Sequence, residues 1–354
     1  MSALEAVSPT LSAIGITDYG VTASYERLKA EKDNGRLNGC DLLFPNIELR
    51  LDLGTTKGNF VNIHLLISPE DPNHIVEANR FLGRLEFSAH RDTFVCTPSD
   101  LMRLGRKSDP TKTTDARALE HGYTQFKVNL RQLLVVYRDI EWAQENIIIA
   151  VAGAADGTSG LKEASDATLR QEIEKAAHVI LTSNAKDREF WLGRGPASAL
   201  EVRGRYGALK PCLWGCDAHE LAKVGKPELD RLCWVKGKPD FDALRQALVD
   251  PERTYVGIMP PSGATPSQVI DSLTISNAPW IRTPTINLNP GLVAIIGARG
   301  SGKTALADMI AAGCDAYSDS EVRPSFLARA QEYLDDAYAK VTWQDGSPKF
   351  DTNR

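Results

Sequence analysis

The residues best suited to chemistry lie in one short stretch, Gly297-Ala-Arg-Gly-Ser-Gly-Lys-Thr304. Its form is G-x-x-x-x-G-K-[ST], the pattern of a loop that cradles phosphates. Glycines let backbone N–H groups approach the β- and γ-phosphates, and the start of a following helix adds partial positive charge. Lys303 would neutralise phosphate oxygens and the Thr304 hydroxyl would hold Mg²⁺. The pattern predicts that ATP with Mg²⁺ is bound by Gly297, Ala298, Arg299, Gly300, Ser301, Gly302, Lys303 and Thr304, with Lys303 and Thr304 as the catalytic residues.

A phosphate loop of this kind must follow a strand and open a helix. Leu292-Val-Ala-Ile-Ile296 is a run of five apolar residues, three of them β-branched, and predicts a fully buried strand. Residues 305–312 are rich in helix formers, and Gly313 is placed to end that helix. We therefore expect strand, loop and helix in that order, as at the opening of a P-loop NTPase domain.

Length and composition describe an ordinary globular chain of 354 residues with two or three domains. The net charge of −5 gives no general attraction to nucleic acid or to anionic membranes, so any nucleic-acid contact needs a local basic patch. No apolar run approaches the roughly 18 residues that cross a bilayer. The six cysteines are dispersed rather than spaced as a disulfide framework. We predict a reduced, cytoplasmic location without a membrane partner.

Before the loop, apolar strand patterns alternate with helical patterns, which indicates an α/β fold. Several expected strands end in polar or glycine-rich residues, including Asp18, Glu48 and the pair Asp217 and His219. Polar residues gathered at strand ends are typical of the active face of a barrel. Residues 251–290 hold seven prolines and few periodic runs. We predict a barrel domain over 1–250, a connector over 251–290 and the first part of an ATPase domain over 291–354.

Two sets of motifs carry a family resemblance. Ile16-Thr-Asp-Tyr19 and Gly215-Cys-Asp-Ala-His219 resemble the T-D-H and S-D-A-H motifs of the PHP superfamily of metal-dependent phosphoesterases. The second set is similar to the TrlF family, in which a PHP domain is fused to an ATPase head of the SMC/ABC type. It comprises Asn184-Ala-Lys-Asp-Arg-Glu-Phe-Trp-Leu-Gly193, Lys210-Pro-Cys212, Phe241-Asp-Ala-Leu-Arg-Gln-Ala-Leu248 and Leu288-Asn-Pro-Gly-Leu292, followed by the phosphate loop.

The resemblance implies a fold and a metal site. The fold would be a distorted, TIM-like (β/α)7 barrel followed by the start of a P-loop NTPase domain. The metal ligands carried over would be Asp18, Glu48, Asp217 and His219, holding Zn or Mn. The H-x-H that opens the superfamily pattern has no counterpart, Tyr19 replaces the histidine of T-D-H, and the loop after residues 146–152 offers only Asp156. Two or three metals need many ligands, so a barrel kept as a scaffold is favoured over an active enzyme.

We therefore expect a fragment of a TrlF-like protein, with ATP hydrolysis in the complete protein and a homodimer formed through the ATPase head. A Walker B carboxylate is not found after Lys303. The resemblance implies action on nucleic acid, in DNA repair or anti-phage defence. The alternative is a metal-dependent PHP phosphoesterase or nuclease that the ATPase head regulates. A third hypothesis is a non-catalytic binding module whose nucleotide site controls assembly.

Four further patterns have an ordinary structural interpretation beside the functional one. Cys212, Cys216, His219 and Cys233 have zinc-binding residue types, but buried cysteines are more often apolar filler. His64 lies inside an apolar strand pattern and is expected to be a core histidine. Residues 53–58 superficially resemble a phosphate loop and are predicted to form a hairpin turn. The basic residues Arg103, Arg106, Lys107 and Lys112 lie in or beside a polar stretch, 105–120, predicted to be an exposed loop, with a nucleic-acid contact as the alternative.

Overall fold

The computed structural model describes residues 1–154, 157–162, 165–261, 268–314, 316, 325–334 and 336–346. Contacts between residues divide the chain into two compact units, Met1–Pro261 and Ser262–Arg354, and each is described by itself. The division falls inside residues 251–290, the range that the sequence predicts as a connector.

The first unit is built on a six-stranded sheet with the strand order β1-β2-β3-β6-β7-β8. Five strands run parallel, and β3 alone runs antiparallel to both of its neighbours. Apolar, largely β-branched runs such as Ile147-Ile-Ile-Ala-Val-Ala152 favour these buried strands. The strands are β1 (Ala13–Tyr19), β2 (Leu42–Gly54), β3 (Phe60–Ile67), β6 (Ile147–Ala152), β7 (Val179–Leu181) and β8 (Cys212–Leu213).

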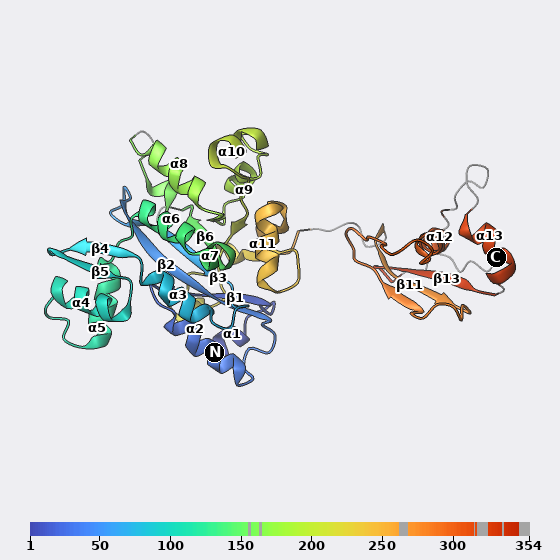
Figure 1. The fold of residues 1–354 in the computed structure, drawn as a ribbon, viewed down its shortest axis with the longest axis horizontal. Coiled ribbons are helices and arrows are strands. Elements are labelled where there is room, and N and C mark those ends of the chain that lie inside the picture. The colour runs from blue at the N-terminus through green and yellow to red at the C-terminus, as the bar shows by residue number, and fades with distance from the viewer. Residues whose placement is uncertain are drawn as a thin grey trace. The chain divides into compact units, whose positions relative to one another are not determined.

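Helices lie on both faces of this sheet (Figure 1). We call the face that carries Ile47, Leu49 and Ile63 the outer face, because these residues belong to the main core under most of the helices. The helices that contribute buried residues to this core are α3 (His74–Leu82), α4 (Pro98–Ser108), α6 (Leu130–Asp139), α7 (Glu141–Asn146), α8 (Ala167–Ala176), α9 (Ala185–Trp191) and α10 (Ala199–Tyr206). The opposite, inner face carries Leu42, Phe44 and Ile148, which pack with Phe241 and Leu244 of α11 (Phe241–Val249).

The edge of the sheet at β1 is covered by α2 (Ala23–Asp33), whose Tyr25 packs in a small separate core with Leu43. Tyr25 is 1% exposed, and its hydroxyl is 2.9 Å from Nε2 of His74. The remaining short elements of this unit are α1 (Ser2–Glu5), β9 (Leu232–Val235), β10 (Thr254–Gly257) and 3₁₀ helices at Thr158–Gly160, Leu221–Lys223, Glu228–Asp230 and Pro251–Arg253. Strands β9 and β10 pair antiparallel with each other.

An α-helical and β-hairpin insert lies between β3 and β6. It holds the hairpin β4 (Glu86–Ala89) and β5 (Asp92–Val95), then α4 and α5 (Asp115–Gln125). The prediction of an exposed loop over 105–120 is therefore wrong for most of that range. Thr97 and Thr114 cap the two helices, and the helices cross closely where Gly105 and Gly122 leave room for backbone contact.

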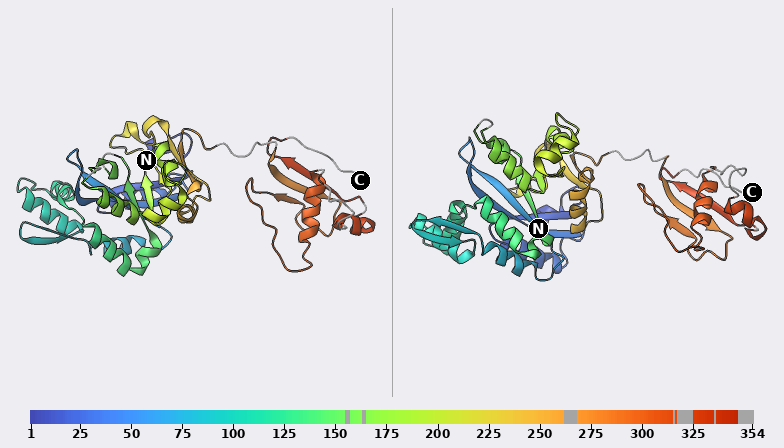
Figure 2. Two further views of the ribbon diagram at one scale, coloured as in Figure 1. Left: turned by 90° about the horizontal axis from the view of Figure 1, so that it is seen from above. Right: turned by 45° about the horizontal axis from the view of Figure 1, so that its top comes forward.

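The predicted α/β fold is confirmed, in the form of a curled, mixed sheet that makes a half-barrel (Figure 2). Consecutive strands are neighbours in space, as they are in a barrel. Among the described residues, β1 and β8 are the edges of this sheet and do not pair with each other. A closed seven-stranded barrel remains a prediction.

The second unit is built on a small antiparallel sheet with the order β12-β11-β13. Its strands are β11 (Ile270–Ser276), β12 (Thr285–Asn287) and β13 (Tyr338–Trp343), and its helices are α12 (Lys303–Gly313) and α13 (Phe326–Leu334). Leu273, Ile275 and Val341 of the sheet form a core with Met309 of α12. Two of these strands, β11 and β12, come from the range predicted as a connector, so this range contributes folded structure to the second unit.

The prediction of a buried strand at 292–296 is wrong for this structure. Leu292 and Ile296 are 91% and 89% exposed, and the segment forms no strand. A fully apolar strand gains its stability from neighbours on both sides. The only sheet that the described part of this unit contains pairs β11 with β12 and β13, and it offers no partner to 292–296.

No helix in the described part of the chain has the length and apolar character needed to span a membrane.

Candidate functional site

The predicted phosphate loop leads directly into a helix. Residues 297–302 form an irregular loop and α12 begins at Lys303. Gly300 and Gly302 adopt φ values of 82° and 87°, which glycine adopts without strain. The predicted helix at 305–312 is thus confirmed. The loop-to-helix half of the expected motif is present, although the strand that should precede it is not.

Lys303 folds back over the loop that precedes it. Its Nζ donates hydrogen bonds of 2.8 Å to the carbonyl oxygens of Gly297 and Ala298. A phosphate bound in the loop would compete with these carbonyl oxygens for the donor protons of the ammonium. The other predicted residues, Arg299, Ser301 and Thr304, are exposed along the same loop and first turn. The residues present therefore fit a polyphosphate with its Mg²⁺.

Asp18, the first predicted metal ligand, is engaged in the fold instead. Its carboxylate accepts hydrogen bonds from the backbone N–H groups of Ser24 at 2.8 Å and Tyr25 at 3.1 Å, in the first turn of α2. Asp18 pairs in register with Ile47, so its side chain lies on the outer face of the sheet. The carboxylate satisfies two amides that the helix leaves unbonded.

Glu48, the second predicted ligand, lies on the inner face, because it pairs in register with Tyr19 on one side and His64 on the other. Its carboxylate is 4.0 Å from Nε2 of His64. Burial lowers the pKa of His64 to about 4, so this histidine is neutral near pH 7. Its Nδ1 is 3.1 Å from the side-chain oxygen of Asn46. The expectation that His64 is a core histidine is confirmed, since it is 9% exposed.

The last two predicted ligands, Asp217 and His219, lie on the loop that follows β8. His219 Nε2 is 3.3 Å from the Asp217 carboxylate, and both side chains are mostly exposed. Asp217 has a positive φ of 42°, a strained conformation for a residue with a side chain. The pKa of Tyr19, on the inner face, is raised by burial first and then by the negative charges of Glu48 and Asp217.

The four predicted ligands do not form one cluster. Asp18 and Glu48 lie on opposite faces of the sheet, and within the part of the chain that the structure describes no group of three or more His, Cys, Asp or Glu side chains is arranged to hold a metal. Asp156, the remaining candidate, lies outside the described residues. The cysteines are free thiols. Burial raises the pKa of Cys212 to about 12 and that of Cys233 to about 11.

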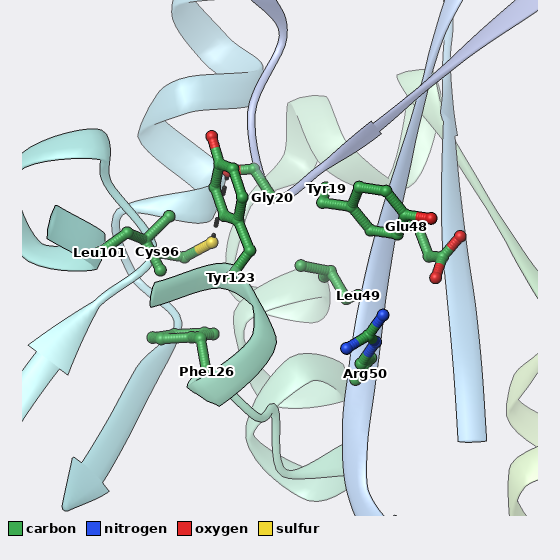
Figure 3. Close-up of a pocket in the computed structure, with 9 residues that line it drawn as sticks. All are labelled: Tyr19, Gly20, Glu48, Leu49, Arg50, Cys96, Leu101, Tyr123 and Phe126. Atoms are coloured by element: carbon green, nitrogen blue, oxygen red, sulfur yellow. Dashed lines mark hydrogen bonds between the residues drawn. The ribbon is translucent and has the colours of Figure 1, made fainter. Parts of the chain in front are cut away.

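An open hollow of about 290 Å³ lies where the insert meets β1 and β2. Figure 3 shows Tyr19, Glu48 and Arg50 from the strands on one side and Tyr123 and Phe126 on the other. Arg50, Tyr123 and Phe126 are not among the site residues predicted from sequence. The signal was present in the alternation Glu48-Leu-Arg-Leu51, which places two opposite charges on the same face of β2.

The basic residues near 103–112 do not form a free positive patch. Arg103 pairs with Asp92 and Asp100, Lys107 with Asp92, Arg106 with Asp115, and Lys112 with Asp109. A cluster whose charges are matched locally has little field left for phosphates. The interpretation as an ordinary exposed surface is favoured over a nucleic-acid contact. The predicted hairpin turn at residues 53–58 is confirmed, since it joins the antiparallel pair β2 and β3.

Neither a protein-family model nor a curated protein matches this sequence.

Proposed function

We propose that this chain binds a nucleoside triphosphate, ATP, with Mg²⁺ at residues 297–304. One observation carries the proposal: a G-x-x-x-x-G-K-T loop turns through left-handed glycines and places its lysine at the first position of an eleven-residue helix. Backbone N–H groups of the loop and the start of α12 would bind the phosphates, and Lys303 would exchange two carbonyl oxygens for phosphate oxygens. The Thr304 hydroxyl would hold Mg²⁺, which neutralises charge on the phosphates.

Titration of the full chain with a fluorescent ATP analogue and Mg²⁺ tests this proposal. Lys303→Ala should weaken binding by at least about tenfold, because a charge-assisted contact to phosphate is lost. Lys340→Ala, which removes an exposed lysine from β13 in the same unit, is the matched control and should leave binding unchanged. Equal affinity of the wild-type chain and Lys303→Ala would refute the proposal.

The alternative, a metal-dependent phosphoesterase or nuclease in the first unit, receives less support. Its predicted ligands Asp18 and Glu48 are separated by the sheet, and Asp18 already caps α2. Elemental analysis of the purified protein separates the two hypotheses. Two or more tightly bound transition-metal ions per chain would favour the phosphoesterase.

We also infer from the resemblance to the TrlF family that the complete protein hydrolyses ATP, acts on nucleic acid and forms a homodimer through its ATPase head. The motifs quoted above are the support for these inferences. ATP turnover by the longest available form of the protein, compared with its Lys303→Ala variant, tests the hydrolysis. No difference between them would leave a non-catalytic binding module.

A further inference from the structure

Two cation–ring pairs lie on adjoining segments, Arg50 with Tyr19 and Lys127 with Phe60, and we call these four side chains the aromatic–cation row. The Arg50 guanidinium carbon lies 5.7 Å from the centre of the Tyr19 ring. Lys127 Nζ lies 4.4 Å from the centre of the Phe60 ring. The two cations are neighbours, because the segment after α5 is hydrogen-bonded to β2: Val128 N–H donates to the Arg50 carbonyl oxygen at 2.8 Å. Two positive charges therefore lie side by side between two aromatic rings.

The row has a carboxylate beside it, Glu48, which lies two residues from Arg50 on the same face of β2. Within the described residues, neither Arg50 nor Lys127 forms an ion pair, in contrast to the basic residues of α4. Lys127 is 7% exposed, and its ammonium donates to the carbonyl oxygens of Thr124 and Phe126. Burial first and then the charge of Arg50 lower the pKa of Lys127 to about 8. Placing two such cations together costs stability unless an anion joins them.

Accessible aromatic surface adjoins the charge. Phe60 is 37% exposed, and Lys127 occupies only one face of its ring. Tyr19 and Arg50 line the hollow beside the insert (Figure 3). At the other end of the row, the Glu48 carboxylate would repel a phosphate and accept a hydrogen bond from an amino group. This polarity directs an anion to the Arg50 and Lys127 end.

We propose that the aromatic–cation row binds a nucleotide unit, with the phosphate at Arg50 and Lys127 and the base stacked on Phe60. A basic groove flanked by aromatic rings is the arrangement that binds single-stranded nucleic acid, since every base has a face to stack. The ligand chemistry, a phosphate beside a base, is shared by a free nucleotide and a strand. The row lies in the first unit and does not depend on the ATP site proposed for the second.

Fluorescence anisotropy with a labelled single-stranded oligothymidylate at low salt tests the proposal, using the full chain in a Lys303→Ala background without Mg²⁺. Arg50→Gln should weaken binding at least about tenfold and reduce the salt slope by about 0.7 for the lost phosphate contact. Phe60→Leu should weaken binding about fivefold or more through lost stacking, and its exposed position spares the fold. Arg117→Gln, on the exposed face of α5, is the matched control and should change binding less than about twofold. Circular dichroism reports whether each variant folds.

Competition experiments identify the source of the ligand. If a nucleoside monophosphate competes as well per phosphate as the unlabelled strand, a free nucleotide is the ligand. Stronger competition by the strand identifies single-stranded nucleic acid. The proposal is overturned if inorganic phosphate competes as well as either, if folded Arg50→Gln and Phe60→Leu bind like their parent, if Arg117→Gln loses as much as Arg50→Gln, or if the parent binds no probe.

Discussion

Replacing Asp18 distinguishes a structural carboxylate from a metal ligand. The structure predicts that Asp18→Ala lowers the free energy of unfolding of the first unit, with or without metal. The carboxylate accepts two N–H groups in the first turn of α2, and one of them belongs to Tyr25, which is 1% exposed. Water can reach the amide of half-buried Ser24 after the substitution, but it cannot easily reach that of Tyr25.

The size of the effect follows from these contacts. A hydrogen bond to a charged group contributes about 1.5–3 kcal/mol, and an orphaned buried donor carries most of that loss. We expect Asp18→Ala to cost about 2–3 kcal/mol, and Asp18→Asn, which keeps one oxygen acceptor, to cost about 1 kcal/mol. Asp33→Ala at the far end of the same helix removes only an exposed pair with Lys29 and should cost less than about 0.5 kcal/mol.

Urea unfolding followed by circular dichroism, combined with amide hydrogen exchange over residues 18–33, measures these changes. Protection should fall in α2 for Asp18→Ala and remain unchanged for Asp33→Ala. Each measurement is repeated with a chelator and with added Mn²⁺ or Zn²⁺. A loss below about 0.5 kcal/mol, or a loss seen only when metal is present, would show that Asp18 serves a metal and not the helix.

Two further predictions test the packing and the buried histidine. In the same urea titration, Gly122→Ala should lower the free energy of unfolding by about 2 kcal/mol or more, because a new Cβ would lie 1.9 Å from the Leu101 carbonyl oxygen. Gly204→Ala is the control, because its helix has open space around it, and it should be neutral or stabilising by up to about 1 kcal/mol. Folding lowers the pKa of His64 from 6.5 to about 4, so between these pH values the folded state binds fewer protons than the unfolded state. The free energy of unfolding should therefore fall by up to about 3 kcal/mol as the pH drops from 6.5 to 4. His64→Gln should flatten this part of the stability profile, His90→Gln on an exposed turn should not, and equal slopes in both variants would contradict the assignment.

The α/β fold of the first unit could be predicted from sequence because its central strands are marked by local apolar runs, such as 147–152. Local patterns also marked the phosphate loop and α12. Tertiary contacts decided the other cases. Residues 105–120 are mostly polar, yet threonine caps and a close glycine crossing make 105–108 and 115–120 helical. The run 292–296 has every local feature of a strand, but the described residues supply no neighbour for it.

The candidate metal site shows why spacing alone could not place side chains. Asp18 and Tyr19 are adjacent in a strand, so their side chains point to opposite faces of the sheet. A shift of one residue in the pairing of β1 with β2 would decide which of them lies on the same face as Glu48. The pattern T-D-Y does not reveal that the Asp18 carboxylate accepts hydrogen bonds from the first turn of α2, which begins a few residues later. The aromatic–cation row was hidden for a different reason. Its members come from β1, β2, β3 and the segment before α6, and only the sheet register brings them together.

The reversed direction of β3 has a consequence for how the first unit acquires its structure. Because β3 and β6 pair as neighbours at Ile67 and Ile147, the chain leaves the sheet after Ser68 and returns beside it, where Ser68 N–H donates to the Asn146 carbonyl oxygen at 2.8 Å. Joining those ends closes a long loop, which costs more entropy than a tight turn. We expect the hairpin of β2 and β3 to form first from local contacts, and the pairing of β6 with β3 to follow once the segment between them has become compact.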